Sequence, residues 1–281
     1  MGATGVWSAF KRHKAGVAGI IIVLILVLSA IFADWIAPYR PTDTTAGLPF
    51  SPPSRSNPFG TDNLGRDIFS GVVHGGRVSL MVGITAALGS TLIGTLIGVL
   101  AGYFRGTVDN VLMRITEVFQ VVPTYVLALV MIALVGPGIT NVMIAIALLS
   151  WPSTARLVRA ETLRLRQQEF VEAALAVGTK DPVIIWRHIL PNAIPAAVIN
   201  GSLQVATAIL IEAGLSFLGL GDPNFVSWGI MLQRSQAIML MAPWTAIFPG
   251  AALSLAALGF NLAGDALNDA LDPRLRTIRQ N

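Results

Sequence analysis

The sequence contains no cysteine and few charged residues. Its 281 residues include 19 Lys or Arg and 15 Asp or Glu, so that 12% are charged, against roughly 25% in an average soluble protein. Without cysteine, disulfides and thiol catalysis are excluded. Because the mean hydropathy is also high, at +0.69, the shortage of charge indicates an integral membrane protein that lies in a lipid bilayer.

Motifs for phosphate binding, metal binding and covalent catalysis are missing as well. No Gly-Lys dipeptide occurs, which excludes a Walker phosphate loop, and no Gly-x-Ser-x-Gly sequence marks a nucleophile. His13, His74 and His188 are too far apart in the predicted topology to form a metal cluster. We therefore expect a chain that is not an enzyme and holds no cofactor or metal. Any ATP and Mg²⁺ used in its function would be bound by another chain.

Long uncharged stretches predict six membrane-spanning helices. A bilayer core about 30 Å thick requires roughly 20 apolar helical residues. The uncharged stretch at 118–155 is too long for one crossing, and Gly136-Pro137-Gly138 divides it into two. The predicted fold is therefore all-α, with spans at residues 15–33, 78–104, 118–135, 139–155, 192–217 and 243–264. An even number of spans places both termini on the same side.

The basic residues are concentrated on one side of this predicted topology. With the N-terminus inside, the inner segments contain all but five of the 19 basic residues. The outer segments contain Arg40, Arg55, Arg66, Arg77 and Arg234. Because Lys and Arg accumulate in cytoplasmic loops, we expect a multi-pass protein of the inner or plasma membrane with both termini cytoplasmic. A net charge of +4 distributed in this way gives no reason to expect nucleic-acid binding.

The predicted organisation follows directly from the spans and their orientation. It comprises a cytoplasmic segment at 1–14, a first transmembrane helix at 15–37, an extracytoplasmic loop at 38–77, a five-helix core at 78–264 that includes a cytoplasmic loop at 156–191, and a cytoplasmic tail at 265–281. A cleaved signal peptide is the alternative for the N-terminus, since Lys11-Arg12-His13-Lys14 precedes an apolar run. That run is longer than a typical signal core, and Asp34-Trp35 follows it where small residues would be expected.

Two features inside the predicted spans concern packing or function. Gly94, Gly98 and Gly102 recur every four residues on one helix face, where small residues permit the close approach of another helix. Glu212 is the one acidic residue predicted to lie within a span, and charge inside a membrane is costly. Glu212 is either a buried acid hydrogen-bonded to a neighbouring helix, or a contact for substrate or a gate. The sequence leaves both interpretations open.

A polar segment between the fourth and fifth predicted spans has the pattern of two short helices joined by a turn. Residues 169–177 are good helix formers. Gly178 suits the left-handed residue that closes a helix. Asp181 followed by Pro182 predicts an N-cap and the first position of a second helix, which should end before Pro191. The first helix carries an apolar face of mostly small residues at helical spacing: Phe170, Ala173, Ala174 and Val177.

The same segment resembles a motif of known transport proteins. Glu172-Ala173-Ala174, then Gly178, and after nine further residues His188-Ile189-Leu190-Pro191 are similar to the Glu-Ala-Ala loop of ABC importer permeases, with His188 where the family has Ile. The stretch GTDNLGRDIFS at 60–70 resembles the segment before the second span of dipeptide and oligopeptide permeases of the C-subunit type. Similar stretches continue along the chain: Asp109 with Met113-Arg114, residues 215–221 and residues 264–273.

This resemblance implies a permease subunit of an ATP-binding-cassette (ABC) importer with the MetI-like permease fold of six transmembrane helices. The implied partners are a homologous second permease in a heterodimer, two cytoplasmic ABC ATPases and an extracytoplasmic substrate-binding protein. The ATPases would drive alternating access, with peptide as the expected substrate. In such families the Glu-Ala-Ala loop docks in a groove of the ATPase. The resemblance thus assigns coupling to Glu172, Ala173, Ala174, Gly178, Asp181 and Pro191.

Several alternatives to peptide import accompany this expectation. The family group also includes importers of nickel or metal chelates and of oligosaccharides. A stand-alone channel or ion-coupled carrier would require a charged ring, a broken-helix pair or an inverted repeat, and a membrane enzyme would require a catalytic cluster. The sequence shows none of these patterns. For the polar segment, adsorption to lipid is the alternative to docking, and a face of mostly alanine is too small for strong lipid anchoring.

Overall fold

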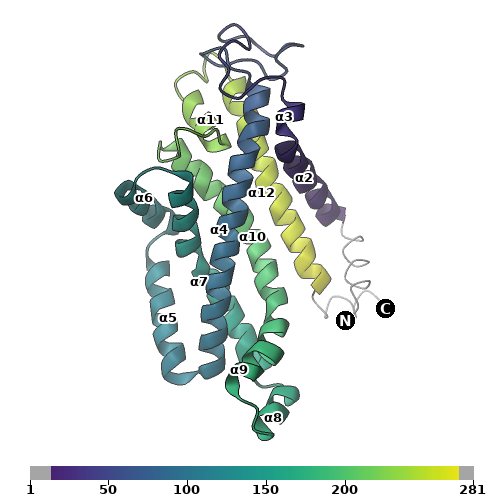
Figure 1. Cartoon of the computed structure of the whole chain (residues 1–281), viewed down its shortest axis with the longest axis vertical. Helices are drawn as coiled ribbons and strands as arrows, with labels where there is room; N and C mark the ends of the chain where they lie inside the picture. The colour runs from purple at the N-terminus through teal and green to yellow at the C-terminus, as the bar shows by residue number, and fades with distance from the viewer. Residues whose placement is uncertain (1–13, 272–281) are drawn as a thin grey trace.

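The computed structural model describes residues 14–271, and over this range the chain consists of helices joined by loops (Figure 1). Helix labels follow Figure 1. The elements are α2 (Lys14–Ile31), α3 (Ala33–Ile36), α4 (Ile68–Phe104), α5 (Gly106–Val121), α6 (Thr124–Val135), α7 (Ile139–Leu165), α8 (Glu169–Ala176), α9 (Asp181–Ile184), a π-helical turn at Ile185–Ile189, α10 (Leu190–Phe217), α11 (Trp228–Ser235) and α12 (Trp244–Leu271).

The long helices confirm the predicted all-α membrane fold. Within residues 14–271, five helical segments are long and apolar enough to span a bilayer, and the bent pair α5–α6 supplies a sixth crossing when it is counted as one span. In Figure 1 the long helices run along the longest axis of the molecule, and α2 begins towards the same end at which α12 finishes. This arrangement matches six crossings of alternating direction.

The third crossing is not the straight helix predicted at residues 118–135. It consists of α5 and α6, whose axes differ by 83° across a short break. Pro123 lies in this break and lacks an N–H group, and Val122 before it is extended, with φ −95° and ψ 132°. Asp109 and Arg114 lie between the predicted spans at 78–104 and 118–135, where charge interrupts the apolar run. Both residues instead lie on α5.

Two predicted helix boundaries are also wrong. Helix α4 begins at Ile68, within the predicted loop 38–77, because the carboxylate of Asp67 accepts a hydrogen bond from the Ser70 N–H at 2.7 Å and caps the helix. Helix α12 continues past residue 264 to Leu271, into the predicted tail 265–281. In both places a charged residue ends the apolar pattern without ending the helix. The rest of the tail and the segment before Lys14 lie outside the described residues.

The glycine repeat on α4 is the contact surface for α7, as its spacing predicts. A Cβ atom placed on Gly94 would lie 2.6 Å from the Cβ of Thr154, and one on Gly98 would lie 2.5 Å from the carbonyl oxygen of Ala155. A Cβ atom placed on Gly102 would lie 2.7 Å from the Cβ of Thr162. The two helices therefore approach so closely that no larger side chain fits between them.

The polar connections lie at opposite ends of the molecule (Figure 1). The loop at 38–67 and α11 lie at one end, here termed the loop end. Helices α8 and α9 lie at the other, here termed the elbow end. The loop end is held by the indole N–H of Trp244, which donates to the carbonyl of Thr61 at 2.9 Å, and by the rings of Phe59 and Phe248, which stack at 3.9 Å.

Candidate functional site

The segment α8–α9 is anchored to the transmembrane helices by a small apolar cluster at the elbow end. Val171 on α8 and Ile184 on α9 are both fully buried. They pack in one cluster with Val99, Tyr103, Val158 and Leu165 from the ends of α4 and α7. Because α8 has only eight residues, its position depends on this packing more than on its own helical stability.

The predicted apolar face of α8 is divided by the structure into an exposed and an anchored part. The side chains of Phe170 and Val177 are 44% and 81% exposed, and Ala173 is exposed as well. Ala174 is half-buried and packs against the cluster around Val171. The prediction of a single free face containing both alanines is therefore wrong for Ala174. Helical spacing alone does not show which side of a short helix meets its own protein.

Gly178 closes α8 in the manner predicted. Its φ is +75°, a left-handed conformation in which residues with a Cβ are strained. The N–H of Gly178 donates to the carbonyl of Leu175 and the N–H of Thr179 to that of Ala174, each at 3.0 Å, which is the Schellman arrangement. Apart from its two chain neighbours, no residue in the range 14–271 has an atom within 4 Å of the position a Cβ would take. Glycine is required here by the backbone conformation and not by crowding.

Asp181 has a different role from the predicted N-cap. It is the first residue of α9, and the N-cap position belongs to Lys180, which makes no side-chain capping bond. The carboxylate of Asp181 instead accepts a hydrogen bond from the Tyr103 hydroxyl at 2.6 Å. The guanidinium of Arg166 lies over the Tyr103 ring, 5.1 Å from its centre. Through Tyr103, these two contacts connect α9 to the ends of α4 and α7.

The expected end of the second helix before Pro191 is also wrong. α9, the π-helical turn and α10 follow one another without a break, forming a continuous 37-residue helix at Asp181–Phe217. In the π-helical turn the N–H of Leu190 donates to the carbonyl of Ile185, five residues earlier. This wider turn accommodates Pro191, which lies in the first turn of α10. Consequently α9 is the first turn of the long helix that continues as α10.

The exposed part of this segment also includes residues that the sequence pattern did not indicate. Val183 and Trp186 are 44% and 64% exposed, and they line a shallow hollow together with Pro182 and Arg187. We define the elbow surface by five of the exposed apolar side chains of α8, its closing turn, α9 and the turn that follows: Phe170, Ala173, Val177, Val183 and Trp186. Glu172 is exposed beside them. Exposed apolar groups gathered in this way are typical of a protein-binding surface.

Glu212 lies far from the elbow surface, in the part of α10 towards the loop end. Its side chain is buried, with 3% exposed. Its carboxyl group accepts hydrogen bonds from the hydroxyls of Ser79 on α4 at 3.2 Å and Ser216 at 2.8 Å. These contacts within the chain favour the first of the two interpretations left open by the sequence, a buried acid that joins neighbouring helices.

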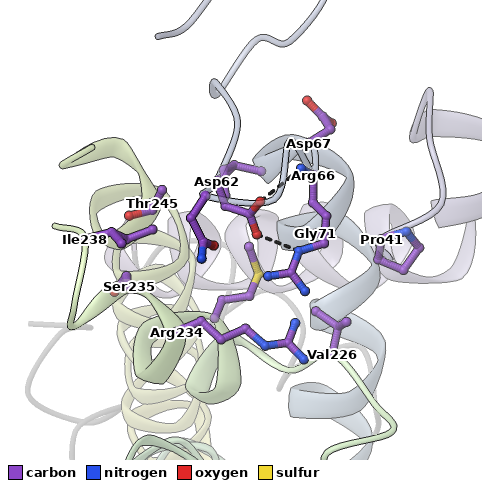
Figure 2. A pocket seen from close by; sticks show the side chains of 13 residues that line it. Pro41, Asp62, Arg66, Asp67, Gly71, Val226, Arg234, Ser235, Ile238 and Thr245 are labelled. Atoms are coloured by element: carbon purple, nitrogen blue, oxygen red, sulfur yellow. Dashed lines mark hydrogen bonds and ion pairs between the residues drawn. The ribbon is translucent and has the colours of Figure 1, made fainter. Parts of the chain in front are cut away.

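A pocket at the loop end carries two arginines (Figure 2). Arg66 is paired with Asp62, with 2.6 Å between the guanidinium and the carboxylate. Arg234 on α11 has no acidic group within 4 Å in the range 14–271. Burial, and to a smaller degree repulsion from Arg66, lowers the pKa of Arg234, and attraction to the carboxylate of Asp62 offsets part of this shift. Arg234 is therefore a partly buried cation at this end of the molecule with capacity to receive a carboxylate.

Comparison with known sequences identifies the family. Residues 94–277 match the family described as the inner membrane component of binding-protein-dependent transport systems. The chain belongs to this family. Residues 4–53 of this permease also match the N-terminal transmembrane domain of oligopeptide transport permease C. The range 94–277 includes the α4–α7 contact, the elbow surface and Glu212, whereas the pair of Asp62 and Arg66 lies between the two matched ranges.

Curated relatives and a solved structure agree with this assignment. The permease is 44% identical over 275 residues to the glutathione transport system permease protein GsiD of Escherichia coli strain 536, with 96% of this chain and 90% of the relative covered. The same values hold for the GsiD protein of Shigella boydii serotype 4. The inward-facing MetNI methionine ABC transporter superposes with a TM-score of 0.60 at 20% identity, covering 72% of this chain and 97% of that one. The MetI-like fold is thereby confirmed.

The contact between Tyr103 and Asp181 can be tested by removing one oxygen atom. Tyr103→Phe retains the ring beneath Arg166 and deletes the hydrogen bond to Asp181, a bond to a charged group worth ~1.5–3 kcal/mol. We expect normal amounts of permease in the membrane but several-fold less solute imported per ATP hydrolysed by the assembled transporter. An unchanged ratio of solute to ATP would show that this bond does not position α9 for transport.

Proposed function

We propose that this permease pairs with a homologous permease and is driven by two ABC ATPases that dock on the elbow surface from the cytoplasm. ATP and Mg²⁺ are bound by these ATPases, and an extracytoplasmic binding protein delivers the solute at the loop end. The observation that carries the proposal is the continuity of α9 with α10. A force applied to the elbow surface acts on the end of a transmembrane helix, which moves as a rigid element.

The exposed side chains support an ATPase groove as the partner of this surface. Ala173 is small and leaves space for a neighbouring surface to approach, and Trp186 offers a large aromatic anchor of the kind that dominates protein interfaces. Acidic Glu172 and basic Arg187 lie beside the apolar residues, so a complementary groove needs groups of both charges. At the opposite end, Arg234 is a candidate contact for an acidic residue of the binding protein.

We infer that the solute is a peptide or a peptide-like molecule. The sequence resemblance to dipeptide and oligopeptide permeases supports this class, and relatives with 44% identity are glutathione transport permeases. Metal chelates and oligosaccharides are the alternatives within the same transport mechanism. Uptake of a labelled peptide by vesicles that contain both permeases and both ATPases, dependent on ATP and on the binding protein, would establish the class.

The orientation of the permease can be tested independently of its substrate. Because the chain has no cysteine, single cysteines can be introduced without background from this subunit. Ser54 is exposed at the loop end and Thr179 lies in the turn after α8. We expect Ser54→Cys to react with a membrane-impermeant thiol reagent on intact cells, and Thr179→Cys to react only after permeabilisation. The reverse result would place the elbow surface outside the cell and exclude contact with ATPases.

A further inference from the structure

A hollow of about 370 Å³ lies midway along the transmembrane helices and shares no lining residue with the elbow surface. Its walls come from the α5–α6 bend, α7, α10 and α12. Gln204, for example, lies near the middle of α10. The lining contains amide and hydroxyl groups beside apolar side chains such as Phe119 and Leu203, and within residues 14–271 no Asp, Glu, Lys or Arg side chain lines it. The principal polar residues are Gln120, Ser153, Asn200, Gln204, Thr207 and Asn261.

The polarity of this hollow shows that acyl chains do not cover it. Thr207 on α10 and Asn261 on α12 are exposed at mid-span, and uncompensated polar groups are costly in hydrocarbon. The surface of α2 is of the opposite kind, since Ile21, Leu24 and Ile25 are each more than half exposed and wholly apolar. The α2 surface suits lipid, whereas the hollow must face water, a second permease or the solute.

Hydrogen bonds within the chain fix the amide groups of the hollow in one orientation. The side-chain nitrogen of Gln204 donates to the carbonyl of Ser150 at 3.0 Å and to the hydroxyl of Ser153 at 3.1 Å. That of Asn200 donates to the hydroxyl of Thr154 at 2.8 Å. No donor to the carboxamide oxygens of Gln204 and Asn200 is found among residues 14–271. Both oxygens therefore remain able to accept hydrogen bonds from a molecule in the hollow.

We propose that this hollow is a subsite for the main chain of the peptide during its passage, an inference that rests on the proposed function. A peptide group offers one N–H donor and one C=O acceptor. The free carboxamide oxygens of Gln204 and Asn200 accept from the N–H, and the Thr207 hydroxyl and the Asn261 amide donate to the C=O. Since no charged side chain lines the hollow, the subsite holds the main chain without selecting the charge of the peptide side chains.

The inference can be tested by adding charge after the transporter has assembled. Thr207→Cys, combined with cysteine-free partner subunits, is modified with an anionic or a cationic methanethiosulfonate reagent. Vesicle uptake of the tripeptides Ala-Glu-Ala and Ala-Lys-Ala is then compared. Because the thiol is a weaker donor than the Thr207 hydroxyl, we expect the unmodified variant to transport both tripeptides more slowly, but at the same ratio as the unsubstituted transporter. The anionic label should lower uptake of the acidic tripeptide relative to the basic one by about fivefold, and the cationic label should do the reverse, as expected for unit charges ~8 Å apart in a partly hydrated path.

A cysteine on the lipid-facing surface provides the matched control. Leu24→Cys on α2 should leave the ratio of the two tripeptides unchanged with either reagent. Failure of both reagents to modify Thr207→Cys, or modification with an equal effect on both tripeptides, would overturn the subsite while leaving ATP-driven peptide uptake intact. Absence of uptake of either tripeptide by the unsubstituted transporter would instead overturn the peptide assignment, and the subsite with it.

Discussion

Replacement of Gly178 by valine is expected to leave the permease in the membrane but to remove most of its transport activity. At φ +75° a residue with a Cβ is destabilised by ~1–2 kcal/mol, and a β-branched residue by more. The space around the Cβ position is empty, so the strain acts on the turn alone and opens the Schellman bonds that close α8. Each ~1.4 kcal/mol of strain in the conformation that binds the ATPase lowers the population of that conformation about tenfold.

The chain contains a second glycine that serves as a matched control. Gly219 closes α10 at the loop end with φ +85°, and apart from its chain neighbours no described residue has an atom within 4 Å of its Cβ position. It has the same pair of hydrogen bonds, from the Gly219 N–H to Ser216 and from the Leu220 N–H to Leu215. Gly219→Val introduces comparable strain far from the elbow surface. We expect ATPase co-purification to fall in Gly178→Val and to remain normal in Gly219→Val. Equal losses in both variants would mean that strain anywhere in the chain, and not the elbow surface, controls the association.

Enlargement of Ala173 is expected to weaken ATPase binding without disturbing the permease itself. Its side chain is exposed and touches none of the anchoring cluster, so a phenylalanine there has room on its own chain. In a close-fitting groove of another protein, the same side chain overpacks at a cost of ~1–3 kcal/mol. We expect the ATPase association of Ala173→Phe to be weaker by about 5- to 100-fold, with ATP hydrolysis no longer linked to uptake.

Lipid adsorption predicts the opposite sign for the same substitution. A larger apolar side chain strengthens binding to a bilayer by ~0.8 kcal/mol for each buried CH₂, so Ala173→Phe would then be neutral or favourable. Ala174→Phe cannot make this distinction, because Ala174 already packs against its own chain and would overpack there. Unchanged co-purification of the ATPases with Ala173→Phe would exclude a close-fitting groove at this position.

Local sequence patterns predicted much of the fold and the closing turn of α8. Uncharged length gave five of the six crossings in nearly the observed places, because the bilayer sets a minimum apolar length. The repeat of Gly94, Gly98 and Gly102 indicated a close helix contact, and the structure identifies α7 as the partner. Gly178 has the predicted positive φ. Each of these features depends on neighbours in the sequence or on the membrane, which is why the sequence was sufficient.

Features that depend on distant residues were predicted incorrectly or missed. Asp181 has the sequence context of an N-cap, but the hydroxyl that bonds it belongs to Tyr103, 78 positions away along the chain. Val171 was not distinguished from its neighbours, because a helix of eight residues offers several plausible apolar faces. Trp186 lies shortly before Pro191, and the sequence pattern predicts that the helix ends before this proline. The π-helical turn accommodates Pro191, so Trp186 belongs to a helix that continues into α10.

The central claim is that the elbow surface is the contact between this permease and an ATPase. Glu172→Cys tests it most directly, because Glu172 is exposed beside Ala173 on α8, and Ser54→Cys at the loop end is the comparison. In the assembled transporter, we expect a short bifunctional thiol reagent to crosslink Glu172→Cys to an ATPase subunit and not to the binding protein. Crosslinking of Glu172→Cys to the binding protein, or of Ser54→Cys to the ATPase, would contradict the account.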